Sequence, residues 1–231
     1  MFVVKILEVK TETTDVKTFY FTKPDHYHFI PGQYTLLKFP GSEISRPFTF
    51  SSSPIENHLG FTIKKMGEFT TKLFDAQIGD ELILDNPKGE ALNFNEEVKE
   101  DVVFIAGGSG VTPFMSSIKY AVHKNLPNNI LLLFGNRTSK DIINFREFNS
   151  FNQPNIKIIH CLSGEVFDDW KGETGFIDSN LIAKYVDNFT NKLFYVCGPP
   201  IMTKLIKQVL IDLNVNEEQI RMEKWELPSK K

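Results

Sequence analysis

The fold is constrained most by one glycine-rich run, Ala106-Gly107-Gly108-Ser109-Gly110-Val111-Thr112-Pro113. An unbroken apolar segment, residues 102–106, leads into this run, and an apolar pattern with helical spacing follows it. A strand, a glycine turn and a helix in succession direct free backbone N–H groups at an anion, and glycine lets a pyrophosphate approach closely. Pro113 suits the first helical turn, but it stands where the usual dinucleotide fingerprint has its third glycine. The run predicts either a phosphate-binding turn or a tight strand-to-helix turn without a ligand.

After this run, strands and helices are expected to alternate to the end of the chain. Apolar runs predict strands at 130–134, 156–162, 193–196 and 221–225. Helical patterns are expected at 141–148, 179–186 and 200–213. Continuous apolar strands that alternate with helices indicate a parallel sheet covered on both faces, as in a Rossmann-like α/β domain.

The first part of the chain has a different pattern, with short runs rich in Val, Ile, Phe and Thr between turn residues. Strands are expected at 2–9, 16–21, 34–39, 47–51, 60–65 and 81–84. One short helix is expected to start near Thr70 or Thr71. Such strands favour a small antiparallel β-barrel. The acidic stretch 93–101 has no apolar period, so the predicted domains are 1–97, a barrel, and 98–231, the parallel sheet.

The composition of the chain excludes some classes of binding partner and indicates a cellular location. The formal net charge is −3 and no basic stripe is present, which argues against a nucleic-acid or anionic-membrane partner. The N-terminus is not a signal peptide and no apolar stretch would span a bilayer, so we expect a cytoplasmic protein without membrane insertion.

Metal binding is not expected from the cysteines and histidines. The two cysteines are far apart, which excludes a four-cysteine iron–sulfur or zinc site. The five histidines show no metal spacing, and His26 and His28 are interpreted as solvent-facing residues of a strand.

Two other segments carry candidate chemistry. Cys197-Gly198-Pro199-Pro200 follows the 193–196 strand, at the sheet edge where ligands bind, although the same residues make a purely structural turn. In the barrel, Arg46-Pro47-Phe48-Thr49 offers a bidentate guanidinium, a flat apolar ring and a hydroxyl, which suit a flavin nucleotide. Taken alone, that segment is better interpreted as an ordinary strand with a surface arginine.

Together these motifs resemble the ferredoxin–NADP reductase superfamily of flavin oxidoreductases, over nearly the whole chain. Arg46-Pro47-Phe48-Thr49 is similar to the Arg-x-Tyr-Ser/Thr flavin motif, and the glycine run is similar to the pyridine-nucleotide loop. The further matches are Phe29-x-Pro31-Gly32-Gln33-Tyr34, Gly67-Glu68-Phe69-Thr70-Thr71, Trp170-x-Gly172-x-x-Gly175, Cys197-Gly198-Pro199-Pro200 and Glu223-Lys224-Trp225.

The resemblance implies a flavin site on the barrel. Arg46 would hold the flavin phosphate, Phe48 would lie against the isoalloxazine ring, and Thr49 would hydrogen-bond near N5. Thr70 and Thr71 would cap a helix that meets the pyrophosphate, and Trp225 would shield the other flavin face. The implied flavin-binding residues are Arg46, Pro47, Phe48, Thr49, Ile63, Lys64, Gly67, Thr70, Thr71 and Trp225.

The resemblance also implies a nucleotide site on the sheet, formed by Gly107, Gly108, Gly110, Val111, Thr112, Pro113, Cys197, Gly198 and Pro199. Cys197 would sit beside the nicotinamide C4 and Glu223 would tune the electrostatics, so the implied catalytic residues are Thr49, Cys197 and Glu223.

The resemblance implies FAD as the cofactor. FAD is preferred to FMN because it is the more frequent cofactor in the family. The acidic residues Glu165, Asp168 and Asp169 favour NADH over NADPH, while Arg137 and Lys140 would serve a 2′-phosphate.

The implied activity is transfer of hydride from NAD(P)H to bound FAD, and then of electrons to a separate ferredoxin, flavodoxin or oxygenase component. Two alternatives stay open. Phe48, in place of the common Tyr, and Lys88-Gly89-Glu90-Ala91 resemble reductases that use free flavin as a substrate. The other alternative is a non-enzymatic flavin-binding module. With two cysteines in the chain, no fused iron–sulfur domain is expected.

Overall fold

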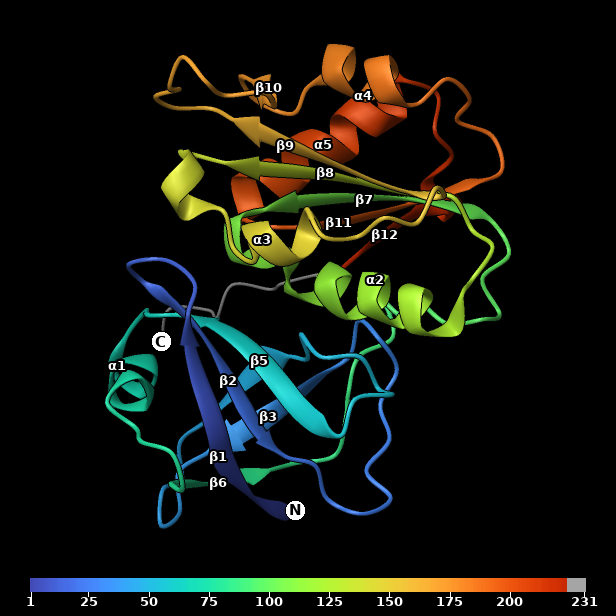
Figure 1. Cartoon of the computed structure of the whole chain (residues 1–231). Coiled ribbons are helices and arrows are strands. Elements are labelled where there is room, and N and C mark those ends of the chain that lie inside the picture. The colour runs from blue at the N-terminus through green and yellow to red at the C-terminus, as the bar shows by residue number, and fades with distance from the viewer. Residues whose placement is uncertain (224–231) are drawn as a thin grey trace, which may run out of the picture.

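The computed structural model describes residues 1–223, which form an antiparallel sheet followed by a parallel one (Figure 1). The first sheet has the strand order β4-β3-β6-β1-β2-β5, and all its pairings are antiparallel. Its strands are β1 (Phe2–Thr11), β2 (Val16–Thr22), β3 (Tyr34–Lys38), β4 (Ser45–Thr49), β5 (His58–Lys64) and β6 (Glu81–Leu84), and α1 (Glu68–Phe74) connects the last two.

The second sheet has the order β10-β9-β8-β7-β11-β12, and all its pairings are parallel. Its strands are β7 (Asp101–Gly107), β8 (Ile130–Asn136), β9 (Ile156–Leu162), β10 (Glu173–Thr174), β11 (Lys192–Cys197) and β12 (Ile220–Met222). The α-helices are α2 (Thr112–Lys124), α3 (Phe145–Phe148), α4 (Ser179–Tyr185) and α5 (Pro200–Asp212), and the 3-10 helices are η1 (Gly108–Val111), η2 (Ser139–Asp141) and η3 (Glu217–Gln219). The predicted fold class, an antiparallel barrel domain before a Rossmann-like sheet, is confirmed.

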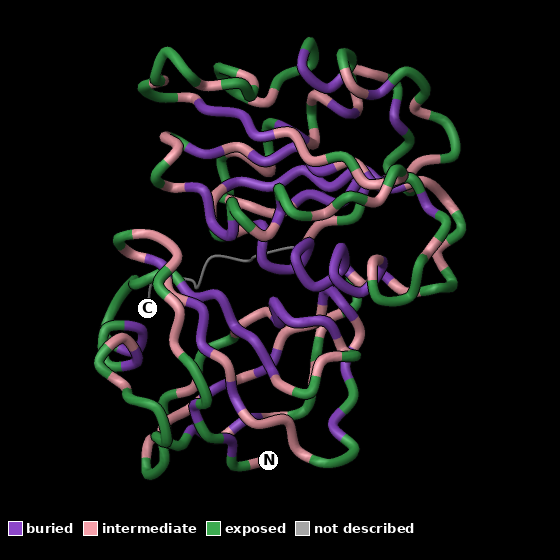
Figure 2. The backbone as a smooth tube through the Cα atoms, in the orientation of Figure 1, coloured by how far each residue is buried: buried purple, intermediate pink, exposed green. Residues whose placement is uncertain are grey.

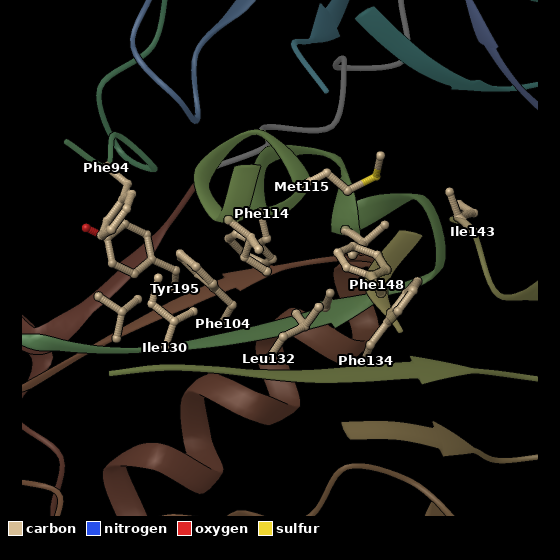
Figure 3. Close-up of a cluster of buried hydrophobic side chains, with 14 of the residues drawn as sticks. Phe94, Phe104, Phe114, Met115, Ile130, Leu132, Phe134, Ile143, Phe148 and Tyr195 are labelled. Atoms are coloured by element: carbon tan, nitrogen blue, oxygen red, sulfur yellow. The ribbon is translucent and has the colours of Figure 1, made fainter. Parts of the chain in front are cut away.

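The parallel sheet is covered on both faces, and most of β7 and β11 is buried (Figure 2). Helices α2 and α3 pack on one face and α4 and α5 on the other. Figure 3 shows the first of these cores, where Phe104 of β7 stacks on Phe114 of α2 with ring centroids 4.6 Å apart. Each such aromatic pair adds about 0.5–1.5 kcal/mol beyond the area it buries.

The two sheets are joined by buried contacts as well as by the chain. Leu92 and Phe94, from the segment between β6 and β7, pack into the core of the second sheet. The Tyr195 hydroxyl donates to the Asn93 carbonyl at 3.1 Å, and the Ser116 hydroxyl of α2 donates to the Ser52 carbonyl at 2.6 Å. These contacts hold the two domains against each other. The domain boundary at 97/98 stays a prediction.

Three local predictions were wrong in detail. The predicted helix 141–148 is broken, because Thr138 and Asp141 close a capping box and Asn144 has a left-handed backbone with φ 54°. Helix α1 starts at Glu68, before Thr70, since Gly67 takes φ 86° and becomes the N-cap. His26 and His28 are exposed but lie in a turn and an irregular segment. The last predicted strand, 221–225, extends beyond the described residues.

Within residues 1–223, no helix is both long and apolar enough to cross a membrane.

One buried histidine gives a testable pH dependence of stability. His160 of β9 is 7% exposed, its two ring nitrogens have no partner among the described residues, and the Phe134 and Phe145 rings lie beside it. Burial lowers its pKa from 6.5 to about 4. On acidification, His160 is therefore protonated at a higher pH in the unfolded chain than in the folded one. As a result, the free energy of unfolding should fall by up to about 3 kcal/mol as the pH drops from about 6.5 to 4.

His160→Phe should remove that part of the pH dependence. Urea unfolding at several pH values between 4 and 7 would measure the slope, with the exposed His28→Phe as the control. An unchanged slope in His160→Phe would contradict the assignment.

Candidate functional site

A cavity of about 1020 Å³ opens between the barrel and the parallel sheet, and we call it the interdomain cavity. Both domains line it, and it gathers most of the residues predicted from the sequence. Those in its lining are Arg46, Pro47, Phe48, Thr49, Ile63, Lys64, Gly67, Thr70, Gly107, Gly108, Gly110, Thr112, Pro113, Cys197, Gly198, Pro199 and Glu223.

Three predicted residues are not in this lining. Thr71 is exposed on α1, and Val111 is fully buried in the core below α2. Trp225 lies outside the described residues.

On the barrel side, β4 presents a cation and an aromatic ring. Arg46 is exposed and its Nη1 donates to the Ser45 carbonyl at 2.9 Å, which uses one of the five guanidinium donors. Phe48 lies two residues further along, on the same strand face. Its ring packs against that of Phe69 of α1, with ring centroids 5.6 Å apart. Because Phe48 is only half-buried, the rest of its surface faces the cavity.

The start of α1 forms the next part of this wall. Gly67 has φ 86°, and a Cβ placed on it would meet no atom within 4 Å, so its backbone faces open space. The Thr70 hydroxyl accepts from the Met66 N–H at 2.6 Å and donates to the Gly67 carbonyl at 3.1 Å. The predicted capping by Thr70 and Thr71 is therefore wrong, because Thr70 sits inside the helix and fixes the turn that precedes it.

On the sheet side, the glycines of the run serve two different purposes. A Cβ on Gly107 would lie 2.3 Å from Met202 Sδ, and one on Gly110 would lie 2.5 Å from the Cys197 carbonyl oxygen. These two glycines allow α5 and the Cys197 turn to pack closely. Gly108, with φ 51°, faces open space, so its backbone is the part of the run that a phosphate can approach.

Cys197 and Glu223 lie together in the cavity. Burial, with a smaller contribution from the Glu223 charge, raises the pKa of the Cys197 thiol to about 12. The thiol therefore stays protonated near neutral pH and is a neutral contact surface, not a nucleophile. Burial raises the pKa of Glu223 to about 6, so this carboxyl is mostly ionised at pH 7.

A second cavity of about 630 Å³ lies beyond the carboxyl ends of β7, β8 and β9, and we call it the sheet-end cavity. It shares Lys64, Gly107, Gly108, Ser109 and Pro199 with the interdomain cavity. This is the edge of a parallel sheet at which ligands bind. The shared loop allows one extended ligand to occupy both cavities.

Several residues of the sheet-end cavity were missed by the sequence analysis. The side chain of Asn136, at the end of β8, is buried without a hydrogen-bond partner among the described residues, as expected of a group that awaits a ligand. Phe176 and Ile201 line the same space although they are strongly exposed. Asn136 was missed because the strand before it was predicted to end at residue 134. No local sequence pattern distinguishes Phe176 or Ile201.

The lining also bears on the choice between the two nicotinamide nucleotides. Ser163 and Arg137 line the sheet-end cavity. The other charged residues weighed from the sequence, Lys140, Glu165, Asp168 and Asp169, are exposed and are not in the lining.

The residues present fit a flavin dinucleotide. Arg46, Lys64 and Lys72 supply cations for phosphates, and Phe48 supplies a flat apolar surface. Gly67 and Gly108 leave room that a side chain would fill. The cavity volume is also ample for such a ligand.

Comparison with known proteins agrees with this geometry. The model of an FAD-binding domain matches residues 1–107, and the model of an oxidoreductase NAD-binding domain matches residues 104–208. The chain is 31% identical over 219 residues to the glycine betaine monooxygenase reductase subunit of Chromohalobacter salexigens, an alignment that covers 90% of this chain and 59% of that protein.

Solved structures share the fold. The CS-b5R domains of human Ncb5or, in the NAD⁺ form, superpose with a TM-score of 0.82 at 28% identity, covering 96% of this chain and 69% of that one. A ferredoxin NADP⁺ reductase from Neisseria gonorrhoeae with bound FAD and NADP gives a TM-score of 0.83 at 22% identity, covering 96% and 97%. The chain spans between 44% and 59% of the length of the first curated relatives that it matches.

Proposed function

We propose that the chain, which matches the models of an FAD-binding domain and of an oxidoreductase NAD-binding domain, is a flavin-dependent NAD(P)H oxidoreductase of the ferredoxin–NADP reductase superfamily. It transfers hydride from NAD(P)H to bound FAD and passes the electrons to a separate acceptor protein. One observation carries the proposal: Arg46 and Thr49 of the barrel share a single cavity with Gly108 and Cys197 of the sheet. That arrangement supports two ligands meeting in one cleft.

The barrel residues hold the cofactor in this proposal. Arg46 binds a flavin phosphate, Phe48 supports the ring system, and Thr49 donates or accepts a hydrogen bond near its reactive edge. When bound, FAD supplies the acceptor for the hydride and later releases the electrons singly or in pairs. Ile63, Lys64 and Gly67 complete the binding wall.

The sheet residues hold the nicotinamide nucleotide. The backbone at Gly108 binds the pyrophosphate, and the neutral Cys197 thiol lies beside the nicotinamide ring. The hydride, one proton with two electrons, leaves that ring as NAD(P)H becomes NAD(P)⁺. The chain contributes alignment of the two rings and exclusion of water, and such positioning supplies most of the acceleration.

The proposal also names the electron donor and the electron acceptor. NADH is the preferred donor on the acidity of the 165–169 segment, while Arg137 in the cavity lining is the residue that would accept NADPH. The acceptor is an oxygenase component, a ferredoxin or a flavodoxin, since relatives are named as a monooxygenase reductase subunit and as dioxygenase electron transfer components. A cytoplasmic location stays a proposal from the sequence.

The absorption spectrum of the purified protein tests this function. We expect a yellow protein that keeps its flavin on a sizing column and is bleached anaerobically by NADH, and more weakly by NADPH. If protein supplied with FAD is bleached by neither nucleotide, the proposal is wrong. Flavin that separates on the column but is reduced in the mixture would identify a free-flavin reductase.

Thr49→Ala should slow flavin reduction about tenfold while the flavin stays bound, because one hydrogen bond near the reacting atoms is lost. Stopped-flow absorbance under single-turnover conditions would measure the rate. Thr190→Ala, at an exposed threonine outside both cavity linings, is the control. An unchanged rate in Thr49→Ala would remove this residue from the catalytic set.

A further inference from the structure

The β1–β2 hairpin of the barrel reaches across to the loop before α3 of the sheet domain (Figure 1). Glu12, just beyond β1, has a side chain that is 4% exposed. Its Oε1 accepts from the Thr18 hydroxyl at 2.9 Å and lies 3.0 Å from Lys10 Nζ. Its Oε2 accepts from the backbone N–H of Asn144, in the other domain, at 3.2 Å.

A second bond crosses the same boundary. Lys10 Nζ donates to Asn144 Oδ1 at 2.9 Å, so Lys10, Glu12 and Asn144 close a ring of interactions between the domains. We call these three residues the interdomain latch. Glu12 is almost fully desolvated, and parting the domains would leave its charge without the Asn144 bond. The latch therefore favours one fixed separation.

Asn144 carries this restraint further into the sheet domain. It has φ 54° and is 4% exposed, and its Nδ2 donates to Glu147 Oε2 at 2.7 Å. Glu147 Oε1 in turn pairs with Lys119 of α2 at 2.8 Å. Helix α2 follows directly on the glycine run, so the barrel hairpin is connected through side chains to the helix behind that run.

The latch also stands next to both walls of the sheet-end cavity. On the barrel side, residues 13–16 line the cavity directly after Glu12. On the sheet side, Asp141 and Ile143 line it directly before Asn144. None of the three latch residues is itself in the lining of either cavity. Their bonds therefore join two segments that each continue into a wall of the cavity.

We propose that the interdomain latch fixes the width of the sheet-end cavity and thereby positions NAD(P)H for hydride transfer across the domain cleft. Lys10, Glu12 and Asn144 are positioning residues that act through the walls beside them. The inference rests on the proposed function, because it takes the sheet-end cavity to hold the nicotinamide nucleotide.

Lys10→Met and Asn144→Gly are the sharpest tests. Methionine removes the charge from an unbranched side chain, and glycine keeps the φ of 54° without strain while it removes the side chain. We expect each variant to raise the nucleotide Kd or lower the flavin-reduction rate about tenfold, with FAD content unchanged. The effect of the double variant should be smaller than the sum of the two single effects, since both changes break the Lys10–Asn144 bond.

Lys207→Met is the matched control. Lys207 is exposed to 41%, against 42% for Lys10, and it pairs with Glu217 at 2.7 Å within the sheet domain. This control should leave the nucleotide Kd and the reduction rate unchanged. If Lys10→Met and Asn144→Gly are as fast and bind as tightly as the wild type, the latch proposal is overturned.

Hydrogen exchange gives a readout that needs no activity. The Asn144 amide, which is bonded to Glu12, should exchange about tenfold faster in Lys10→Met than in the wild type or Lys207→Met. If the wild type reduces no flavin, the proposed function fails, and this measurement still decides whether the latch exists. An unchanged exchange rate at Asn144 would overturn the latch.

Discussion

Arg46→Ala should weaken FAD binding about a hundredfold, because a charged hydrogen bond to a phosphate contributes on the order of 1.5–3 kcal/mol. Arg46 is exposed and has one backbone bond, to Ser45, so its loss removes little from the fold itself. A fluorescence titration of the apoprotein with FAD would measure the Kd.

Two further variants make that measurement specific. Arg46→Lys keeps the charge but loses the bidentate geometry, so its Kd should lie between those of the wild type and Arg46→Ala. Arg146→Ala removes an exposed arginine that lines neither cavity, and its Kd should equal that of the wild type. Equal FAD affinities in Arg46→Ala and the wild type would exclude Arg46 as a phosphate ligand.

Gly108→Asp should raise the nucleotide Kd about a hundredfold or more while most of the flavin is retained. The Cβ would point into open space in both cavities, and Asp tolerates the φ of 51°. A carboxylate beside a bound pyrophosphate adds like-charge repulsion of several kcal/mol at the ~4 Å range. Spectral titration of the oxidised flavoprotein with NAD⁺ and NADP⁺ would report the affinity.

Gly108→Asn separates charge from bulk. It has the same shape without the charge, so its loss of affinity should be about tenfold smaller than that of Gly108→Asp. Gly79→Asp, at another open glycine with φ 94° outside both cavities, controls for backbone strain. If Gly108→Asp binds nucleotide like the wild type, the pyrophosphate does not lie on this loop.

Gly110 is a less suitable position than Gly108 for a variant that tests nucleotide binding. Its Cβ would collide with the backbone of the Cys197 turn, so any side chain there disturbs the fold before it meets a ligand. The motif alone could not separate Gly108 from Gly110, because both are glycines of one turn. Only the position of the Cys197 turn, brought alongside by the pairing of β7 with β11, makes the distinction.

Helix prediction failed where remote partners decide the backbone. The pattern over 141–148 has helical spacing, yet Asn144 takes a left-handed conformation. Its side chain is held by Lys10, 134 residues earlier in the chain, and by Glu147. Hydrogen bonds of this kind are not visible in the local sequence, and they are also what forms the interdomain latch.

The residues that line the cavities also divide into those that a local sequence pattern identified and those that only the structure revealed. Arg46, Phe48 and Thr49 were identifiable because a cation, a ring and a hydroxyl in one strand are a local pattern. Asn136 and Phe176 were not, since their role comes from the space around them.

By itself the sequence determined the two-domain architecture, the glycine turn after the first long buried strand, and the residue types offered to phosphates and rings. These follow from the periodicity of apolar residues and from turn chemistry, which act over a few neighbours. The tertiary structure alone decided which glycine faces open space, how Glu12 reaches Asn144, and that two cavities share one loop. Those features depend on contacts between segments far apart in the chain, and such contacts exist only once both cores have packed.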